Sequence, residues 1–88
     1  MDEGPLACDE LMVILKGALR RRLKEKGNGI FISSHEALGS VTEEYNELVD
    51  AVTKNDPVNF MEECLDVAVA AFFSYVSMRH IERLNNDK

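Results

Sequence analysis

The strongest constraint in this sequence is the stretch from Cys64 to Phe73, which is apolar at every position except Asp66. It lies in a predicted helix that begins at Asp56–Pro57, a good N-cap followed by a preferred first-turn residue, and runs to about Leu84. A helix that is apolar on all sides needs neighbours on all sides. An 88-residue chain can hardly surround one of its own helices. We therefore expect a second copy to supply the cover, in a homodimer or homotetramer; the alternative is an apolar monomer that aggregates.

Two more helices are predicted upstream of this one. Leucines at every fourth position mark one buried face of a helix over residues 9–26, which Gly27 and Gly29 should end. A second helix is expected to begin at the capping-box pair Ser33 and Glu36. Its buried face is predicted to carry Leu38, Val41, Tyr45, Leu48 and Val52.

No β-sheet is expected, because the apolar segment Ile30–Ile32 has no other segment with which it could pair. It is interpreted as a loop that is pinned to the core. The two connections are short, so consecutive helices should pack roughly antiparallel. The predicted fold is therefore an all-α antiparallel bundle of three helices, forming one domain over residues 1–88 and completed by oligomerisation.

Charge and composition exclude several classes of partner. The net charge is −6, which argues against nucleic acid because such binding depends on Lys and Arg. The start MDEGPLACDE lacks the basic and apolar regions of an export signal, and the weakly charged run 64–78 is shorter than the roughly 20 residues that cross a bilayer. Cys8 and Cys64 form neither a metal-ligand spacing nor a disulfide framework. A cytoplasmic protein without a membrane partner is expected.

Four acidic residues are expected to converge. Glu44 and Glu47 point the same way on the second helix, whereas Glu43 turns toward water. Glu63 and Asp66 repeat the spacing on the third helix, and antiparallel pairing would bring both pairs to one level. Carboxylates clustered beside an apolar core repel one another unless cations lie between them. All-oxygen ligands favour Mg²⁺ or Mn²⁺ over zinc; the alternative is a solvated helix face.

The pattern Glu43-Glu44-x-x-Glu47, then fifteen residues, then Glu63-x-x-Asp66 resembles the paired signature of the MazG-like all-α nucleoside triphosphate pyrophosphatases. The likeness covers roughly residues 34–78, and HEALGSVTEEYNELVDAV is similar to the second helix of short bacterial and phage members. The resemblance implies an enzyme that splits a nucleoside triphosphate into the monophosphate and pyrophosphate, in nucleotide-pool house-cleaning. It implies Mg²⁺ ligands at Glu44, Glu47, Glu63 and Asp66. It also implies that Glu47 or Glu43 orients the attacking water or takes its proton.

The basic residues leave two interpretations open. The group Arg20–Arg22, Lys24 and Lys26 is typical of a solvated helix end that complements the helix dipole, with contact to substrate phosphates as the alternative. Arg79 and Arg83 lie beyond the carboxylates on the third helix. They are equally consistent with ligands of a phosphate chain and with a polar helix end.

Other features favour structural roles. His35 is interpreted as a loop-packing residue and Glu36 as a cap, because no Cys or Asp partner at a suitable spacing indicates zinc or nucleophilic chemistry. A second class of function also remains open. The chain could be a non-catalytic helical assembly or nucleotide-binding module that keeps the MazG-like fold, which its short length favours.

Overall fold

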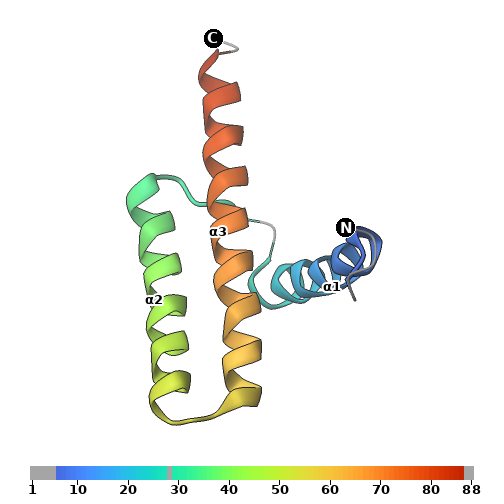
Figure 1. Cartoon of the computed structure of the whole chain (residues 1–88). Helices are drawn as coiled ribbons and strands as arrows, with labels where there is room; N and C mark the ends of the chain where they lie inside the picture. The colour runs from blue at the N-terminus through green and yellow to red at the C-terminus, as the bar shows by residue number, and fades with distance from the viewer. Residues whose placement is uncertain (1–5, 28, 87–88) are drawn as a thin grey trace.

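The computed structural model describes residues 6–27 and 29–86 and consists of three α-helices (Figure 1). They are α1 (Cys8–Lys26), α2 (Ser34–Thr53) and α3 (Pro57–Asn86). The described residues contain no strand, so the prediction of an all-α fold with three helices is confirmed. Residues 1–5 and Asn28 lie outside the described residues. Half of the N-terminal segment MDEGPLACDE, from which no export signal was predicted, is therefore not described.

The arrangement of the helices differs from a regular bundle. α2 and α3 lie side by side and are joined by a short turn at residues 54–56, so the chain reverses direction between them (Figure 1). α1 packs against α3 but crosses it instead of running alongside it (Figure 1). The connection from α1 to α2, residues 27–33, is long enough to lead the chain past α3. The described chain is therefore a hairpin with a crossing helix.

Local side-chain hydrogen bonds fix where the helices begin and end. The Ser33 hydroxyl accepts a bond from the Glu36 N–H at 3.1 Å, and the Glu36 carboxylate accepts one from the Ile32 N–H at 3.1 Å. Asp56 accepts one from the Asn59 N–H at 3.1 Å. The predicted caps are confirmed, although Glu36 reaches one residue further back than a standard capping box requires. Gly27 ends α1 with a φ of 80°, a conformation that glycine adopts readily.

The linker is fastened to α3 at one point. Ser77 is fully buried, and its hydroxyl accepts a hydrogen bond from the Phe31 N–H at 3.0 Å. The guanidinium of Arg22 in α1 lies 4.0 Å from the centre of the Phe73 ring and 5.7 Å from that of Phe31. Such cation–π contacts stabilise by roughly 0.5–2 kcal/mol. α1, the linker and α3 meet here, which holds the last turns of α1 over the hairpin.

The buried face of α2 is rotated relative to the predicted one. Its buried or half-buried apolar residues are Ala37, Val41, Leu48 and Ala51. Its exposed ones are Leu38, Tyr45, Val49 and Val52. The prediction was therefore wrong for three of its five residues within this chain. α3 packs on the side of α2 that carries Ser40 and Glu44, so the bulkier apolar row faces away from it.

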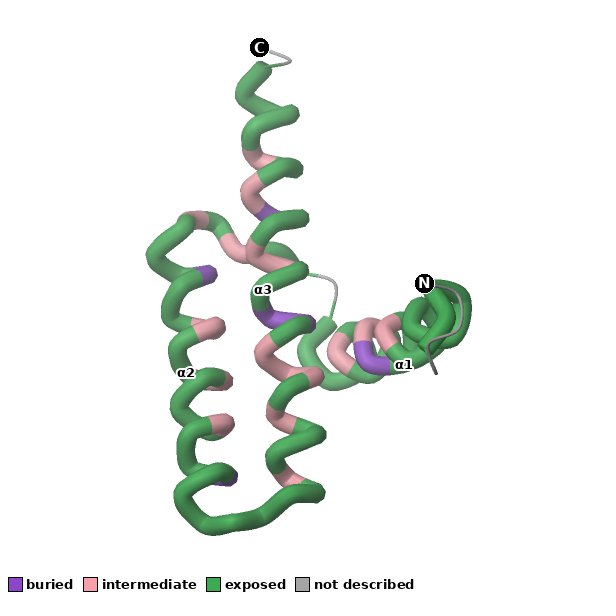
Figure 2. The backbone as a smooth tube through the Cα atoms, in the orientation of Figure 1, coloured by how far each residue is buried: buried purple, intermediate pink, exposed green. Residues whose placement is uncertain are grey.

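α3 contacts its neighbours along one side only. Val69, Ala70 and Ser77 are buried there, and most of the remaining helix is exposed (Figure 2). Large apolar side chains occupy the exposed side: Val58, Met61, Phe72, Tyr75 and Val76. The apolar surface that the sequence predicts all round α3 is thus covered on one side by α1 and α2 and is uncovered on the other.

α3 also meets a minimal criterion for a membrane-crossing helix. It has 30 residues and contains an 18-residue window with a mean hydropathy of 1.2, of which 17% is buried in the described chain. The prediction of no membrane partner was based on the length of residues 64–78, whereas α3 spans Pro57–Asn86. A core helix of a water-soluble protein satisfies the same criterion, so this finding is a weak indication.

Replacing Ser77 by Ala should destabilise the fold. The Phe31 N–H would lose its only described partner in a partly buried position, which costs about 1–3 kcal/mol. Ser74→Ala is the matched control, since the Ser74 hydroxyl bonds only to Ala70 of its own helix and its loss should cost less than about 0.5 kcal/mol. Urea unfolding of both variants measures the difference. Equal unfolding free energies would show that the Phe31–Ser77 bond does not fasten the linker.

Candidate metal centre

The α2–α3 hairpin brings four carboxylates together. Each of Glu44, Glu47, Glu63 and Asp66 offers one oxygen, and these four oxygens all lie within 4.8 Å of one another. Glu44 and Glu47 are separated by one turn of α2, and Glu63 and Asp66 by one turn of α3, so each pair points from one face of its helix. The four residues that the sequence predicts as metal ligands therefore lie in one cluster.

Two of these carboxylates hold buried oxygens without a described partner. Oε2 of Glu44 and Oε2 of Glu63 are shielded from solvent and accept no hydrogen bond from any described residue. Glu44, Glu63 and Asp66 are half-buried, whereas Glu47 is exposed. An unpartnered buried carboxylate oxygen carries a desolvation cost of a few kcal/mol. A cation between the four side chains would remove that cost.

The cluster raises the pKa values of its members. Burial raises the pKa of Glu63 to about 7, and the neighbouring carboxylates of Glu47, Asp66 and Glu44 raise it further. Burial also raises the pKa of Glu44, and Glu47 and Asp66 add to this while Lys26 opposes it. Burial raises the pKa of Asp66 as well, against the lowering effect of Arg21. Ionised carboxylates are therefore held together at an energetic cost.

The donor set fits a hard divalent cation. Carboxylate oxygens without Cys or His favour Mg²⁺, Mn²⁺ or Ca²⁺ over zinc. Two oxygens on opposite sides of one Mg²⁺ are about 4.2 Å apart, and on opposite sides of one Ca²⁺ about 4.8 Å. The observed span of 4.8 Å accommodates either ion after small side-chain rotations, so the geometry selects a class of ion and not Mg²⁺ alone.

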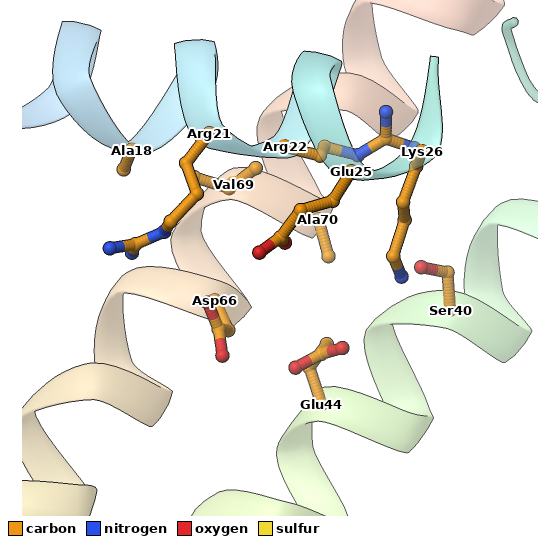
Figure 3. A pocket seen from close by; sticks show the side chains of 10 residues that line it. All are labelled: Ala18, Arg21, Arg22, Glu25, Lys26, Ser40, Glu44, Asp66, Val69 and Ala70. Atoms are coloured by element: carbon orange, nitrogen blue, oxygen red, sulfur yellow. The ribbon is translucent and has the colours of Figure 1, made fainter.

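A cavity of about 100 Å³ lies beside the cluster, between α1 and the hairpin. Arg21, Glu25 and Lys26 extend from α1 toward Asp66 and Glu44, whereas Arg22 lies along its own helix (Figure 3). Ser40 of α2 lines the cavity near Lys26 (Figure 3). The remaining lining residues are the small apolar ones, Ala18, Val69 and Ala70. The α1 side of the cavity, formed by Arg21, Glu25 and Lys26, therefore carries both positive and negative charge. We call it the α1 wall; it faces the acidic residues Glu44 and Asp66.

Other predicted site residues lie away from the cluster. Glu43 is exposed and is not among the four converging carboxylates. Arg79 and Arg83 line a separate hollow near the end of α3. Arg79 is thirteen residues beyond Asp66, or about 20 Å along the helix axis. Within one chain the structure does not bring either arginine to the carboxylates. Their role as phosphate ligands stays a prediction.

Sequence reasoning missed two cavity residues, Glu25 and Ser40. Ser40 precedes Glu44 by one helical turn, a spacing that places both on one face of α2. Glu25 follows Arg21 by the same spacing on α1. Both spacings are visible in the sequence. Only the crossing of α1 over the hairpin, however, brings Glu25 and Ser40 to the same cavity. His35 is exposed at the start of α2, outside this site.

Comparison with known proteins adds no identification. No protein-family model matches the chain, and neither the curated proteins nor the solved structures gave a match. The chemistry of the site therefore rests on its own residues.

The raised pKa of Glu63 predicts a pH dependence of stability in the absence of divalent ions. The folded state holds a proton on Glu63 up to about pH 7, whereas the unfolded state loses it near 4.5. The folded state therefore binds more protons between these values, and stability should fall as the pH rises from about 4.5 to about 7. Glu63→Gln should flatten this fall in melting temperature, measured with a chelator present.

Glu43→Gln serves as the control, since Glu43 is exposed and outside the cluster, and should keep the wild-type slope. Identical slopes for the wild type and Glu63→Gln would contradict the placement of Glu63 in a partly buried acidic cluster.

Proposed function

We propose that the protein is a divalent-cation-dependent nucleoside triphosphate pyrophosphohydrolase of the MazG-like type, with Mg²⁺ or Mn²⁺ as its cofactor. The observation that carries the proposal is the convergence of Glu44, Glu47, Glu63 and Asp66 with two buried oxygens lacking described partners. The same four residues form the signature pattern in the sequence. Its role would be the removal of unwanted nucleotides from the cytoplasmic pool.

The residues divide into two roles in this proposal. Glu44, Glu63 and Asp66 are half-buried and would hold the cation. A bound divalent ion supplies neutralisation of phosphate charge and a lowered pKa of bound water. Glu47 is exposed, so its carboxylate is the accessible one that would orient a water molecule toward the α-phosphorus and accept its proton. The bond between the α-phosphorus and the bridging oxygen then breaks, and pyrophosphate leaves with that electron pair. Glu43 is the alternative base.

The uncovered apolar surfaces support a homodimer or homotetramer. The buried apolar residues of the described chain are Ala18, Ala37, Ala51, Val69 and Ala70, which form a small core. A buried Leu or Phe contributes roughly 1.5–3 kcal/mol, and here most large apolar side chains stay exposed. A copy of the chain packed on the outer side of α3 would complete the bundle and bury Phe72 and Met61.

Light scattering should report at least a dimer at micromolar concentration. Phe72→Asp should shift the protein toward monomers, because a charge would be buried in the contact between copies. Asn46→Asp is the control, because it adds a charge on the exposed polar face of α2 beside Glu43 and Asp50 and should leave association unchanged. A wild-type monomer, or a chain that needs detergent or lipid to stay dispersed, would contradict this proposal and in the second case favour a membrane as the cover of α3.

Pyrophosphate release from a panel of canonical and modified nucleoside triphosphates tests the activity and the substrate together. With Mg²⁺ the wild type should release pyrophosphate, and Asp66→Asn should lower the rate at least about 100-fold because a metal ligand is lost. Asp50→Asn is the matched control, since Asp50 pairs with Lys54 on the exposed surface and should retain the rate within about twofold.

The same variants separate the enzyme from a non-catalytic module. Millimolar Mg²⁺ should raise the melting temperature of the wild type and of Asp50→Asn, but not that of Asp66→Asn. An ion-dependent rise without pyrophosphate release from any nucleotide would contradict the enzyme and favour a metal- or nucleotide-binding assembly module. Absence of both effects would refute the metal centre itself.

A further inference from the structure

The basic residues of α1 divide between two sides of the helix. Arg21 and Lys26 line the cavity beside the carboxylates; Lys26 extends toward Glu44, and Arg21 extends along the side of the cavity where Asp66 lies (Figure 3). Arg20 and Lys24 do not line it, although all four side chains are exposed. All four lie in the last two turns of α1, where cations complement the helix dipole. The helix dipole therefore explains why this segment is basic. It does not explain why Arg21 and Lys26 line the cavity while Arg20 and Lys24 do not.

The cavity-side cations stand close to the carboxylates without pairing with them. Among the described residues, neither Arg21 nor Lys26 forms an ion pair within 4.0 Å. Each is still near enough to act electrostatically, Lys26 on Glu44 and Arg21 on Asp66. A space of about 100 Å³ separates the two sets of charges. Direct neutralisation of the cluster would have closed that space with salt bridges.

We propose that Arg21 and Lys26 bind phosphate oxygens of a polyphosphate chain whose other side is held, through divalent cations, by the carboxylates of Glu44, Glu63 and Asp66. This inference rests on the proposed function for its cation-binding half. Guanidinium and ammonium groups are the side chains best suited to phosphate oxygens. The ligand class is a divalent-cation complex of a di- or triphosphate. Both residues belong to the basic group of α1 for which contact with substrate phosphates was the alternative interpretation, whereas Arg79 and Arg83 line a separate hollow.

The charge of the cavity favours a cation-bound polyphosphate over a free anion. Glu25 extends into the same space between Arg21 and Lys26 (Figure 3). A bare phosphate chain would meet the carboxylates of Glu25, Glu44 and Asp66 there. A chain carrying divalent cations offers positive charge to these acids and phosphate oxygens to the two basic side chains.

The α1 wall of the cavity is held in position by contacts on both sides of it. Arg22, adjacent to Arg21, also lines the cavity, but its guanidinium stacks on Phe73 and its side chain lies along α1 (Figure 3). The linker that follows Lys26 is fastened by the hydrogen bond from Phe31 to Ser77. Arg21 and Lys26 therefore extend from a segment anchored on both sides, so little of the wall needs to be ordered when a ligand binds.

Calorimetric titration of the full chain with inorganic tripolyphosphate, in the presence of Mg²⁺, tests the proposal. Arg21→Gln and Lys26→Gln should each weaken binding about tenfold, because each removes a charge-assisted bond to phosphate. Arg20→Gln and Lys24→Gln remove the same charge from the same turns on the solvent side and should change affinity less than about twofold. Titration with Mg²⁺ alone should show equal or tighter binding for the cavity-side variants, because a nearby positive charge is gone.

Equal losses for cavity-side and solvent-side variants would overturn the proposal, as would a wild type that binds no tripolyphosphate with Mg²⁺. Loss of Mg²⁺ binding in Arg21→Gln and Lys26→Gln would overturn it too, since it would indicate a structural role. Failure of the proposed function is distinguishable. If no nucleotide yields pyrophosphate while the two sets of variants still differ in tripolyphosphate affinity, the proposed enzymatic activity is refuted. Phosphate binding by Arg21 and Lys26 is then still supported.

Discussion

The α2–α3 hairpin has to hold together four carboxylates that repel one another, three of which are half-buried. The hairpin places Glu44, Glu47, Glu63 and Asp66 within 4.8 Å, although burial and mutual charge raise the pKa of three of them. Small side chains between the helices, Ala37, Ala51 and Ala70, permit this close approach. A fold that keeps such an arrangement without ions loses stability, which supports the proposal that the cluster is one half of a binding site.

The other half of the proposed site comes from α1. Its last turns cross the hairpin because Arg22 stacks on Phe73 and because Ser77 holds the linker. This crossing brings Arg21 and Lys26 opposite the acids and leaves a cavity between them. An ordinary antiparallel third helix would have covered the cluster along its whole length. The crossing also leaves the first turns of α1 and the outer side of α3 without cover, which links the geometry of the site to the proposed assembly of copies.

Much of the fold and the core of the site follow from sequence spacing. The caps at Ser33 and Asp56 and the stop at Gly27 depend on local hydrogen bonding and backbone conformation, which neighbouring residues determine. The convergence of the carboxylates follows from two one-turn spacings and a short connection at residues 54–56. These features are local, or depend on one hairpin, and therefore can be predicted without knowledge of the other contacts.

The remainder depends on contacts between distant segments. Leu38 and Tyr45 suit a buried stripe as well as Ala37 and Ala51 do, and only the position of α3 decides which pair it covers. The linker at 27–33 sends α1 across α3 through a bond between Phe31 and Ser77, which are 46 positions apart in the sequence. No helical periodicity encodes that bond. The cavity roles of Glu25 and Ser40 follow from the crossing and were missed for the same reason.

Anomalous diffraction from crystals of the protein grown with Mn²⁺ shows whether the cluster binds a cation. If Glu44, Glu63 and Asp66 form a metal site, a manganese peak is expected between their carboxylates, within bonding distance of oxygens from both α2 and α3. A map without such a peak, in which Lys26 or Arg21 instead forms direct salt bridges with these carboxylates, would contradict it. The cluster would then be a charge network that the chain neutralises with its own side chains.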